Sequence, residues 1–443
     1  METIAKEDST LMKRRKFIQS SMMALGTSAL PLARSKPVDD RSRALPRRGG
    51  SLTTIQAPLA IAMWDYSWLL RHHRGGEFAD WDRALDGLAE RGYNALRIDC
   101  FPHLVAAGKT GERQEEFFHP KGDWKPALWG NPYSMYSRPR ESLIAFLTKC
   151  RKRGIRVGLA TWFLAHGTER NRDVQGLDDF VRVWDETLTI IDKNGLLDGI
   201  LYVDLLNEYP LWHGFEWLER TLDSMADTPK KADGNADIPN GNPALSKGIK
   251  YNPRQKAFYE NFLNEVIGRL RAKWPNLDFF ASLTIDDQVL WEEMDISRFA
   301  ALDAHVWFVN YDPFTRETGY MKIHMLENDL SFEKTYRAMK EYWRDHRQEM
   351  TGWMDQEIGK RAEVARKHRI PCGNTEGWGP VFWMEHPLLD WEWTKEACEA
   401  AVDLAVKHGY RFICTSNFTH PQFRTLWDDV EWHKRLTSKI KKG

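Results

Sequence analysis

The sequence predicts an α/β protein with a (β/α)8 TIM barrel that carries insertions after strands four and six. Short apolar segments alternate with amphipathic helical segments, and this unit recurs eight times within residues 55–443. Such alternation favours a parallel sheet with right-handed crossovers. A doubly wound open sheet is the alternative, but its glycine-rich first turn is missing, because the first apolar segment runs into Trp64-Asp65-Tyr66-Ser67-Trp68.

The first half of the barrel is predicted from four apolar segments. Strands are expected at residues 59–66, 94–101, 156–163 and 199–208. The first helix shows the pattern most clearly, since residues 81, 84, 85 and 88 are apolar and share a helical face before Gly92 ends the helix. The next helices are expected at residues 138–153, 177–193 and 253–274, the first two ending at Gly154 and at Asn194-Gly195.

The second half follows the same alternation. Strands are expected at residues 277–283, 302–308, 370–376 and 411–416. Helices are expected at residues 331–368, 391–408 and 427–440. Two insertions, residues 209–251 and 310–330, follow the fourth and sixth strands. They therefore lie at the barrel face where enzymes of this fold carry their active sites.

Composition excludes some classes of function. Lys+Arg and Asp+Glu both number 63, so the net charge is zero, which argues against a nucleic-acid-binding protein. Beyond residue 55 no run of 18 apolar residues occurs, so no transmembrane segment is expected. The five cysteines form no CxxC motif and are expected to be small core residues. The 20 tryptophans fit either a large core or platforms that stack on sugar rings.

The first residues predict export. Lys13-Arg14-Arg15-Lys16-Phe17-Ile18-Gln19 precedes a short run of apolar and small residues, which is typical of a signal peptide of the bacterial twin-arginine type. We expect a signal peptide at residues 1–34, a polar linker at 35–54 and the barrel domain at 55–443, with the protein periplasmic or secreted. A basic disordered tail is the alternative interpretation.

The candidate chemistry lies at the ends of two predicted strands. Strand four ends in Asn207-Glu208 and strand seven in Thr375-Glu376. Two carboxylates on facing strands can flank one glycosidic bond, one as an acid for the leaving oxygen and one as a nucleophile. A single glutamate at a strand end would more often be a surface charge, but the pair on strands four and seven favours catalysis.

These residues resemble those of the clan A glycoside hydrolases, and of the family 5 or cellulase-like group in particular. The resemblance implies that Glu208 is the acid/base, Glu376 the nucleophile, and that Asn207 contacts the 2-hydroxyl of the sugar. It also implies that Arg97 on strand two pairs with the nucleophile. His305-Val306-Trp307 resembles the His-x-Tyr motif of strand six, with Trp307 in place of the tyrosine.

The sequence departs from the family pattern at other strand ends. Strand three carries Thr161-Trp162 in place of the usual histidine, and strand eight ends in Ser416-Asn417-Phe418 in place of the usual tryptophan. Several aromatic residues lie near predicted strand ends and are expected to form walls of a carbohydrate-binding cleft, although each one alone would more often be a packing residue. They are Trp64, Tyr66, Trp68, Trp162, Trp212, Trp307 and Trp378, and the four tryptophans Trp64, Trp162, Trp307 and Trp378 are expected to bind the substrate.

Elementary electrostatics adds roles that do not depend on the family. Arg97 directed at Glu376 would keep that carboxylate ionised, as a nucleophile requires. The alternative is a buried ion pair between Arg97 and Asp99, which share a strand face. His305 is expected to hydrogen-bond either the nucleophile or a sugar hydroxyl, unless it is an ordinary core histidine.

The sequence therefore predicts an exported, retaining β-glycoside hydrolase with a carbohydrate substrate and no metal or organic cofactor. One alternative is a metal-dependent sugar isomerase or epimerase on the same barrel, which would use Glu208, His305 and Glu376 as ligands. Another is a carbohydrate-binding barrel without catalytic activity. The sequence defines neither the sugar nor the oligomeric state.

Overall fold

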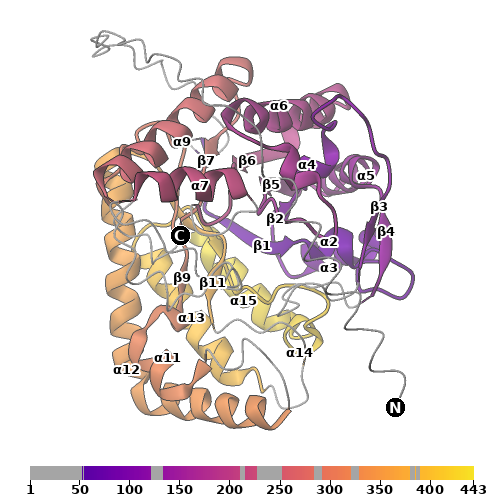
Figure 1. Cartoon of the computed structure of the whole chain (residues 1–443). Helices are drawn as coiled ribbons and strands as arrows, with labels where there is room; N and C mark the ends of the chain where they lie inside the picture. Colours follow the sequence, from indigo (N-terminus) through magenta and orange to yellow (C-terminus); the bar gives the residue numbers. More distant parts are fainter. Residues whose placement is uncertain are drawn as a thin grey trace, which may run out of the picture. The chain divides into compact units, whose positions relative to one another are not determined.

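Eight parallel strands form the nearly closed barrel of the computed structural model, which confirms the predicted (β/α)8 fold (Figure 1). The strands are paired in the order β7-β6-β5-β2-β1-β12-β10-β8. A parallel bridge between Leu283 and Ala304 links the segments that follow the two outermost strands. In chain order the strands are β1 (Leu59–Asp65), β2 (Ala95–Asp99), β5 (Arg156–Ala160), β6 (Ile200–Asp204), β7 (Phe279–Phe280), β8 (Leu302–Asp303), β10 (Cys372–Asn374) and β12 (Phe412–Cys414).

The structure describes most of the chain beyond the amino-terminal segment. The described residues are 52, 54–120, 133–209, 215–226, 252–283, 292–320, 329–379, 385 and 390–443. The predicted signal peptide, nearly all of the predicted linker and the polar stretch at residues 227–250 lie outside these ranges. No helix in the described ranges has both the length and the apolar character needed to cross a bilayer.

Helices follow most strands in the predicted order. The first, α3 (Trp81–Glu90), buries its predicted apolar face, and the Asp80 side chain caps it by accepting a hydrogen bond of 3.1 Å from the Arg83 N–H. The other large helices are α5 (Pro139–Lys152), α6 (Leu177–Lys193), α9 (Pro253–Lys273), α12 (Asp329–His368), α13 (Glu392–Lys407) and α15 (Val430–Lys442). These helices supply the outer layer that a parallel barrel requires.

The insertions contain structure that the sequence pattern did not predict. The insertion after β6 contains α7 (Glu216–Met225), and the one after β8 contains α11 (Asp312–Thr318). A third, unpredicted insertion lies between β2 and α5, and its strands β3 (Phe117–His119) and β4 (Met135–Ser137) form an antiparallel pair. The remaining short elements are α2 (Ser67–Leu70), α4 (Pro102–Val105), η1 (Arg170–Asp173), η2 (Leu197–Gly199), β9 (Val306–Trp307), η4 (Phe308–Asn310), β11 (Gly377–Trp378) and α14 (Arg424–Trp427).

The strands are shorter than the apolar segments that predicted them, because the backbone turns at their carboxyl ends. Non-glycine residues with positive φ gather at these ends: Asp65, Phe101, Phe163, His166, Glu208 and Trp378. Residues other than glycine seldom adopt a positive φ without support from their surroundings, and those that do are concentrated at functional sites. The carboxyl face of the barrel is therefore where the chain is most constrained.

Candidate active site

Glu208 is held four residues beyond the end of β6 by a serine on the neighbouring strand segment. The Glu208 N–H donates a hydrogen bond of 3.0 Å to the Ser282 hydroxyl oxygen. Ser282 in turn donates to both carboxylate oxygens of Asp204, through its N–H at 2.8 Å and its hydroxyl at 2.7 Å. The turn gives Glu208 a φ of +49°. Asp204 and Ser282 thus fix the backbone that presents the Glu208 carboxylate.

Glu376 is fixed between a buried threonine and a close backbone contact. Thr375 donates through its N–H at 3.0 Å and its hydroxyl at 2.5 Å to the two carboxylate oxygens of Asp303. On the other side, Gly377 has a φ of +151°, and a Cβ atom there would lie 2.3 Å from the carbonyl oxygen of Val306. Only glycine permits this approach of β11 to β9. The Glu376 backbone is therefore constrained on both sides.

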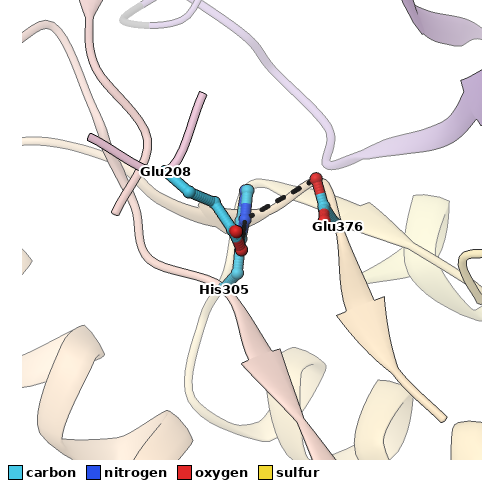
Figure 2. A group of neighbouring side chains, drawn as sticks. All are labelled: Glu208, His305 and Glu376. Carbon is cyan, nitrogen blue, oxygen red and sulfur yellow. Dashed lines mark hydrogen bonds and ion pairs between the residues drawn. The ribbon is translucent and has the colours of Figure 1, made fainter. Parts of the chain in front are cut away.

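The two glutamates face each other across His305 (Figure 2). One carboxylate oxygen of each, together with a ring nitrogen of His305, forms a group whose atoms all lie within 4.8 Å of one another. Nδ1 of His305 lies 2.9 Å from Oε1 of Glu208 and 3.8 Å from Oε2 of Glu376. The glutamates are 6% and 4% exposed, so the pair is nearly enclosed by protein.

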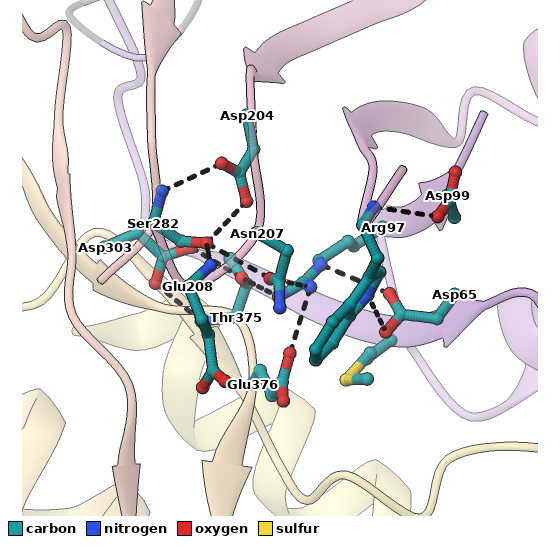
Figure 3. A network of polar contacts seen from close by, with 12 residues as sticks. Asp65, Arg97, Asp99, Asp204, Asn207, Glu208, Ser282, Asp303, Thr375 and Glu376 are labelled. Carbon is teal, nitrogen blue, oxygen red and sulfur yellow. Dashed lines mark hydrogen bonds and ion pairs between the residues drawn. The ribbon is translucent and has the colours of Figure 1, made fainter. Parts of the chain in front are cut away.

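Arg97 joins the nucleophile candidate to Asn207 (Figure 3). Its Nη2 lies 3.0 Å from Oε2 of Glu376 and also donates to the side-chain oxygen of Asn207, while Nη1 donates to the Thr375 hydroxyl at 3.0 Å. The guanidinium is fully buried. Strands two, four and seven thus meet at a single cation, and the predicted residues Arg97, Asn207, Glu208, His305 and Glu376 do lie together.

The proton affinities differ from the sequence-based expectation. Burial, reinforced by repulsion from Glu208, raises the pKa of Glu376 to about 8, although His305 and Arg97 oppose the shift. Arg97 does lower the pKa of Glu376, as predicted, but burial and Glu208 outweigh its effect. Burial lowers the pKa of His305, but Glu376 and Asp303 outweigh that effect and raise it to about 10. The site thus contains an imidazolium between carboxyl groups at neutral pH.

The four tryptophans predicted as cleft walls divide into two pairs. Trp64 and Trp378 have no exposed surface, and their indole N–H groups donate to the carbonyl oxygens of Thr419 and Cys414 at 2.9 and 2.7 Å. In this structure neither ring offers a face to a sugar, so that prediction is wrong for this pair, whose role is packing. Trp162 and Trp307 are 5% and 7% exposed and remain candidates for sugar contact.

The alternative ion pair between Arg97 and Asp99 does not form. Asp99 accepts hydrogen bonds from the backbone N–H groups of Phe101 and Trp162, at 2.7 and 3.0 Å. Arg97 instead pairs with Asp65, whose Oδ1 lies 3.3 Å from Nε. Asp65 was not predicted from the sequence, although an aspartate within an apolar strand segment is an unusual signal.

Four other supporting residues, buried polar side chains around the pair, were also missed: Asp204, Ser282, Asp303 and Thr375.

Among the described residues, the group that could hold a metal ion consists of Glu208, His305 and Glu376. Two carboxylates and an imidazole are suitable donors for several divalent cations. Arg97 lies 3.0 Å from Glu376, however, and a protonated His305 has no lone pair to donate. A metal would have to displace one positive charge and compete with another, so these residues suit proton transfer better than metal binding.

Comparison with known proteins identifies the family of the chain. A family model described as sugar-binding cellulase-like matches residues 61–441. The chain belongs to the cellulase-like family. This membership confirms the predicted resemblance to cellulase-like glycoside hydrolases.

One solved structure shares the fold over most of the chain. A crystal structure from Parabacteroides distasonis, described as a proposed glycoside hydrolase, is 32% identical, with a TM-score of 0.71 over 87% of this chain and 94% of that one. An endo-β-1,4-mannanase from Thermotoga petrophila is 10% identical, with a TM-score of 0.47 over 89% of this chain and 79% of that one. The second likeness is too distant to inform the substrate. No curated protein sequence matches the chain.

Proposed function

We propose that this cellulase-like protein is a retaining β-glycoside hydrolase that acts on an oligo- or polysaccharide. The observation that carries the proposal is the spacing of the two glutamates, whose nearest carboxylate oxygens lie within 4.8 Å. Retaining enzymes hold their carboxyl groups about 5–5.5 Å apart, whereas inverting enzymes need about 6.5–9.5 Å to admit a water molecule. The spacing favours direct attack by a carboxylate on the anomeric carbon.

In the proposed reaction Glu376 is the nucleophile and Glu208 the acid/base. The Glu376 carboxylate forms a bond to the anomeric carbon while the glycosidic C–O bond breaks and Glu208 gives its proton to the leaving oxygen. Glu208 then takes a proton from water, whose oxygen attacks the anomeric carbon and releases Glu376. Both carboxyl groups return to their starting state.

Proton placement is the role we assign to His305. Glu376 has a raised pKa, so a proton must leave it before it can attack. Nδ1 of His305 lies 2.9 Å from Glu208 and 3.8 Å from Glu376. The ring is therefore between Glu376, which must lose a proton before it attacks, and Glu208, which must hold one for the leaving oxygen. Arg97, 3.0 Å from Glu376, then stabilises the ionised nucleophile.

Sugar recognition is assigned to Asn207, Trp162 and Trp307. The Asn207 side-chain oxygen is taken by Arg97, while its Nδ2 is buried and has no hydrogen-bond partner among the described residues. A buried donor without a partner is costly, and a sugar hydroxyl that accepts from it would remove that cost. The two tryptophans keep a small exposed edge for contact with the sugar ring.

The proposal is tested with Glu208→Gln and Glu376→Gln on a panel of aryl β-glycosides and β-linked oligosaccharides. Each variant should lose about 10²–10⁴-fold in kcat/KM, because each removes one proton-transfer or nucleophilic group. Glu357→Gln is the control, since Glu357 is equally buried but pairs with Arg361 on α12. Activity that survives in both active-site variants would reject the assignment and leave the carbohydrate-binding barrel as the better account.

A metal-dependent sugar isomerase is the second candidate function, favoured only by the Glu208–His305–Glu376 group. It is distinguished by the metal content of the purified protein and by aldose–ketose conversion after addition of Mn²⁺ or Mg²⁺. We expect hydrolysis to be unaffected by a chelator. Isomerisation that depends on the added cation would favour this candidate.

We also propose that the protein is exported through its twin-arginine segment to the periplasm or the medium. Arg14→Lys together with Arg15→Lys keeps the positive charge but removes the paired arginines. In a bacterial host the double variant should accumulate in the cytoplasm as the full-length chain, while the unmodified protein is shortened and exported. Equal export of both would contradict the proposal.

A further inference from the structure

Asp65 is turned toward the site by an irregularity in strand β1. The register between β1 and β2 shifts between Met63 and Asp65, and Asp65 has a φ of +31°. A bulge of this kind re-aims a side chain, and bulges are frequent beside active sites. The Asp65 side chain is fully buried. The strand is therefore distorted at the position where it places a carboxylate beside Arg97.

Asp65 and Glu376 occupy two different edges of the Arg97 guanidinium (Figure 3). Oδ1 of Asp65 lies 3.3 Å from Nε, and Oε2 of Glu376 lies 3.0 Å from Nη2. The other oxygen of Asp65 accepts a hydrogen bond of 3.2 Å from the indole N–H of Trp162. Arg97 is thus shared by two carboxylates, and Trp162 fixes the carboxylate of Asp65.

We propose that Asp65 is a positioning residue for the nucleophile: it holds Arg97 by its Nε edge and draws part of the guanidinium charge away from Glu376. The inference rests on the proposed function, in which Glu376 must change from a protonated to an ionised carboxyl group. A guanidinium committed wholly to Glu376 would overstabilise its ionised form and weaken it as a nucleophile. Sharing with Asp65 moderates that effect.

The surrounding charges agree with this role. Burial raises the pKa of Asp65 above its usual range, with a small contribution from Glu208, although Arg97, the Trp162 hydrogen bond and His305 oppose the shift. Burial is also the main cause of the raised pKa of Glu376, and Asp65 adds to that shift.

The other titratable groups near Asp65 are the buried phenol of Tyr66 and the buried carboxyl of Asp99. Removal of the Asp65 charge should lower the proton affinity of Glu376 in two ways: it removes a repulsion between the two carboxylates, and it leaves Arg97 to pair with Glu376 alone.

The test is a carboxyl titration that needs no substrate. Protein labelled with ¹³C at the glutamate carboxyl carbon is titrated by NMR, and the Glu376 signal is assigned by its loss in Glu376→Gln. In Asp65→Asn the Glu376 midpoint should fall by about one pH unit, a tenfold loss of proton affinity. Asp99→Asn is the matched control, because it removes a buried carboxyl at the same barrel face that does not pair with Arg97; its shift should be clearly smaller.

A second variant covers the case in which Asp65→Asn does not fold. Trp162→Phe removes the indole N–H that bonds to Asp65 while keeping an aromatic ring. Loss of this hydrogen bond favours the neutral form of Asp65 and should lower the Glu376 midpoint by a smaller amount. An unchanged or higher midpoint in the folded variants would overturn the inference. A purely structural Asp65 would lower the melting temperature without moving the midpoint.

Kinetics separates this inference from the proposed function. On the best aryl β-glycoside of the panel, the acidic limb of the kcat/KM profile should move to lower pH in Asp65→Asn. If the midpoint of Glu376 moves but no hydrolysis is found, the proposed function fails, while the effect of Asp65 on the proton affinity of Glu376 stands. If hydrolysis requires both glutamates but neither the midpoint nor the acidic limb moves, the role of Asp65 fails alone.

Discussion

At the scale of single residues, the site holds more buried carboxyl groups than its two cations can neutralise. Arg97 lies within 4 Å of the carboxyl groups of Asp65 and Glu376. His305 lies within 4 Å of those of Glu208, Asp303 and Glu376. Burial of a charge that is not fully paired is costly, so at least one carboxyl group holds a proton. This arrangement of charges is therefore expected to reduce the stability of the fold.

The loss of stability caused by the buried carboxyl groups should depend on pH. Because the pKa of Glu376 is raised to about 8, its contribution to stability is complete below its ordinary pKa of 4.5 and is lost as the pH rises through 8. Glu376→Gln should therefore raise the melting temperature by a few degrees at pH 9 and have little effect at pH 4. Thermal unfolding followed by circular dichroism across this range is the measurement.

Glu357→Gln should change stability with pH in the opposite direction to Glu376→Gln. Burial would raise the pKa of Glu357, but Arg361 and Lys360 outweigh it and lower the pKa. Its contribution to stability is present above its ordinary pKa and lost as the pH falls through the lower folded value. The variant should be destabilised at pH 7–9 and nearly neutral at low pH. Equal effects in both variants would contradict the account.

The sequence predicted these residues unevenly, for physical reasons. Glu208 and Glu376 are recognisable because they end two apolar segments and follow Asn207 and Thr375. Asp65 is not, because a bulge reverses the face that its strand position would imply. The burial of Trp64 could not be predicted either, since strand periodicity does not reveal which loops and helices cover a given ring.

At the scale of elements, the strand-seven turn depends on one glycine. A Cβ atom on Gly377 would lie 2.3 Å from the Val306 carbonyl oxygen and 2.8 Å from the Asn374 side chain. Gly377→Ala should therefore separate β11 from β9, displace the neighbouring Glu376 and lower kcat/KM by at least about tenfold. Small displacements of a catalytic group have effects of this size.

Gly352→Ala is the matched control for that variant. Gly352 lies exposed within α12, and an added Cβ meets nothing within 4 Å. Alanine is the better helix former, so the substitution should stabilise the protein by about 0.5–1 kcal/mol and leave kcat/KM unchanged. Activity assays and denaturant titration of both variants check the prediction. Equal activity in the two would show that the turn does not position Glu376.

Elements were predicted best where periodicity is long. The predicted helix at residues 177–193 coincides with α6, and α12 covers the predicted 331–368, although the helix bends at His346. The β3–β4 pair was missed because three-residue strands have no measurable periodicity and are defined by cross-strand pairing. The helix α11 was missed because its 7 residues make only about two turns, too few to show a helical period.

At the scale of the whole molecule, the barrel buries every cysteine. All five thiols are free and buried, which confirms the prediction that they are core residues. Burial also raises the pKa of Cys372 and of Cys398 to about 12, so few thiolates form at neutral pH. The folded protein should therefore react slowly with a thiol reagent, and five thiols should react at once in guanidinium chloride. Rapid labelling of the folded protein would contradict the packing of the barrel.

The central claim is that Glu376 attacks the anomeric carbon while Glu208 serves as acid/base, and azide rescue tests it most directly. With an activated aryl β-glycoside and sodium azide, Glu376→Gly should regain activity and give the α-glycosyl azide, since azide replaces the missing nucleophile in one displacement. Glu208→Ala should give the β-glycosyl azide, because azide then attacks the glycosyl-enzyme in place of activated water. Proton NMR of the products reads both configurations. The same configuration from both variants, or the reverse assignment, would contradict the account.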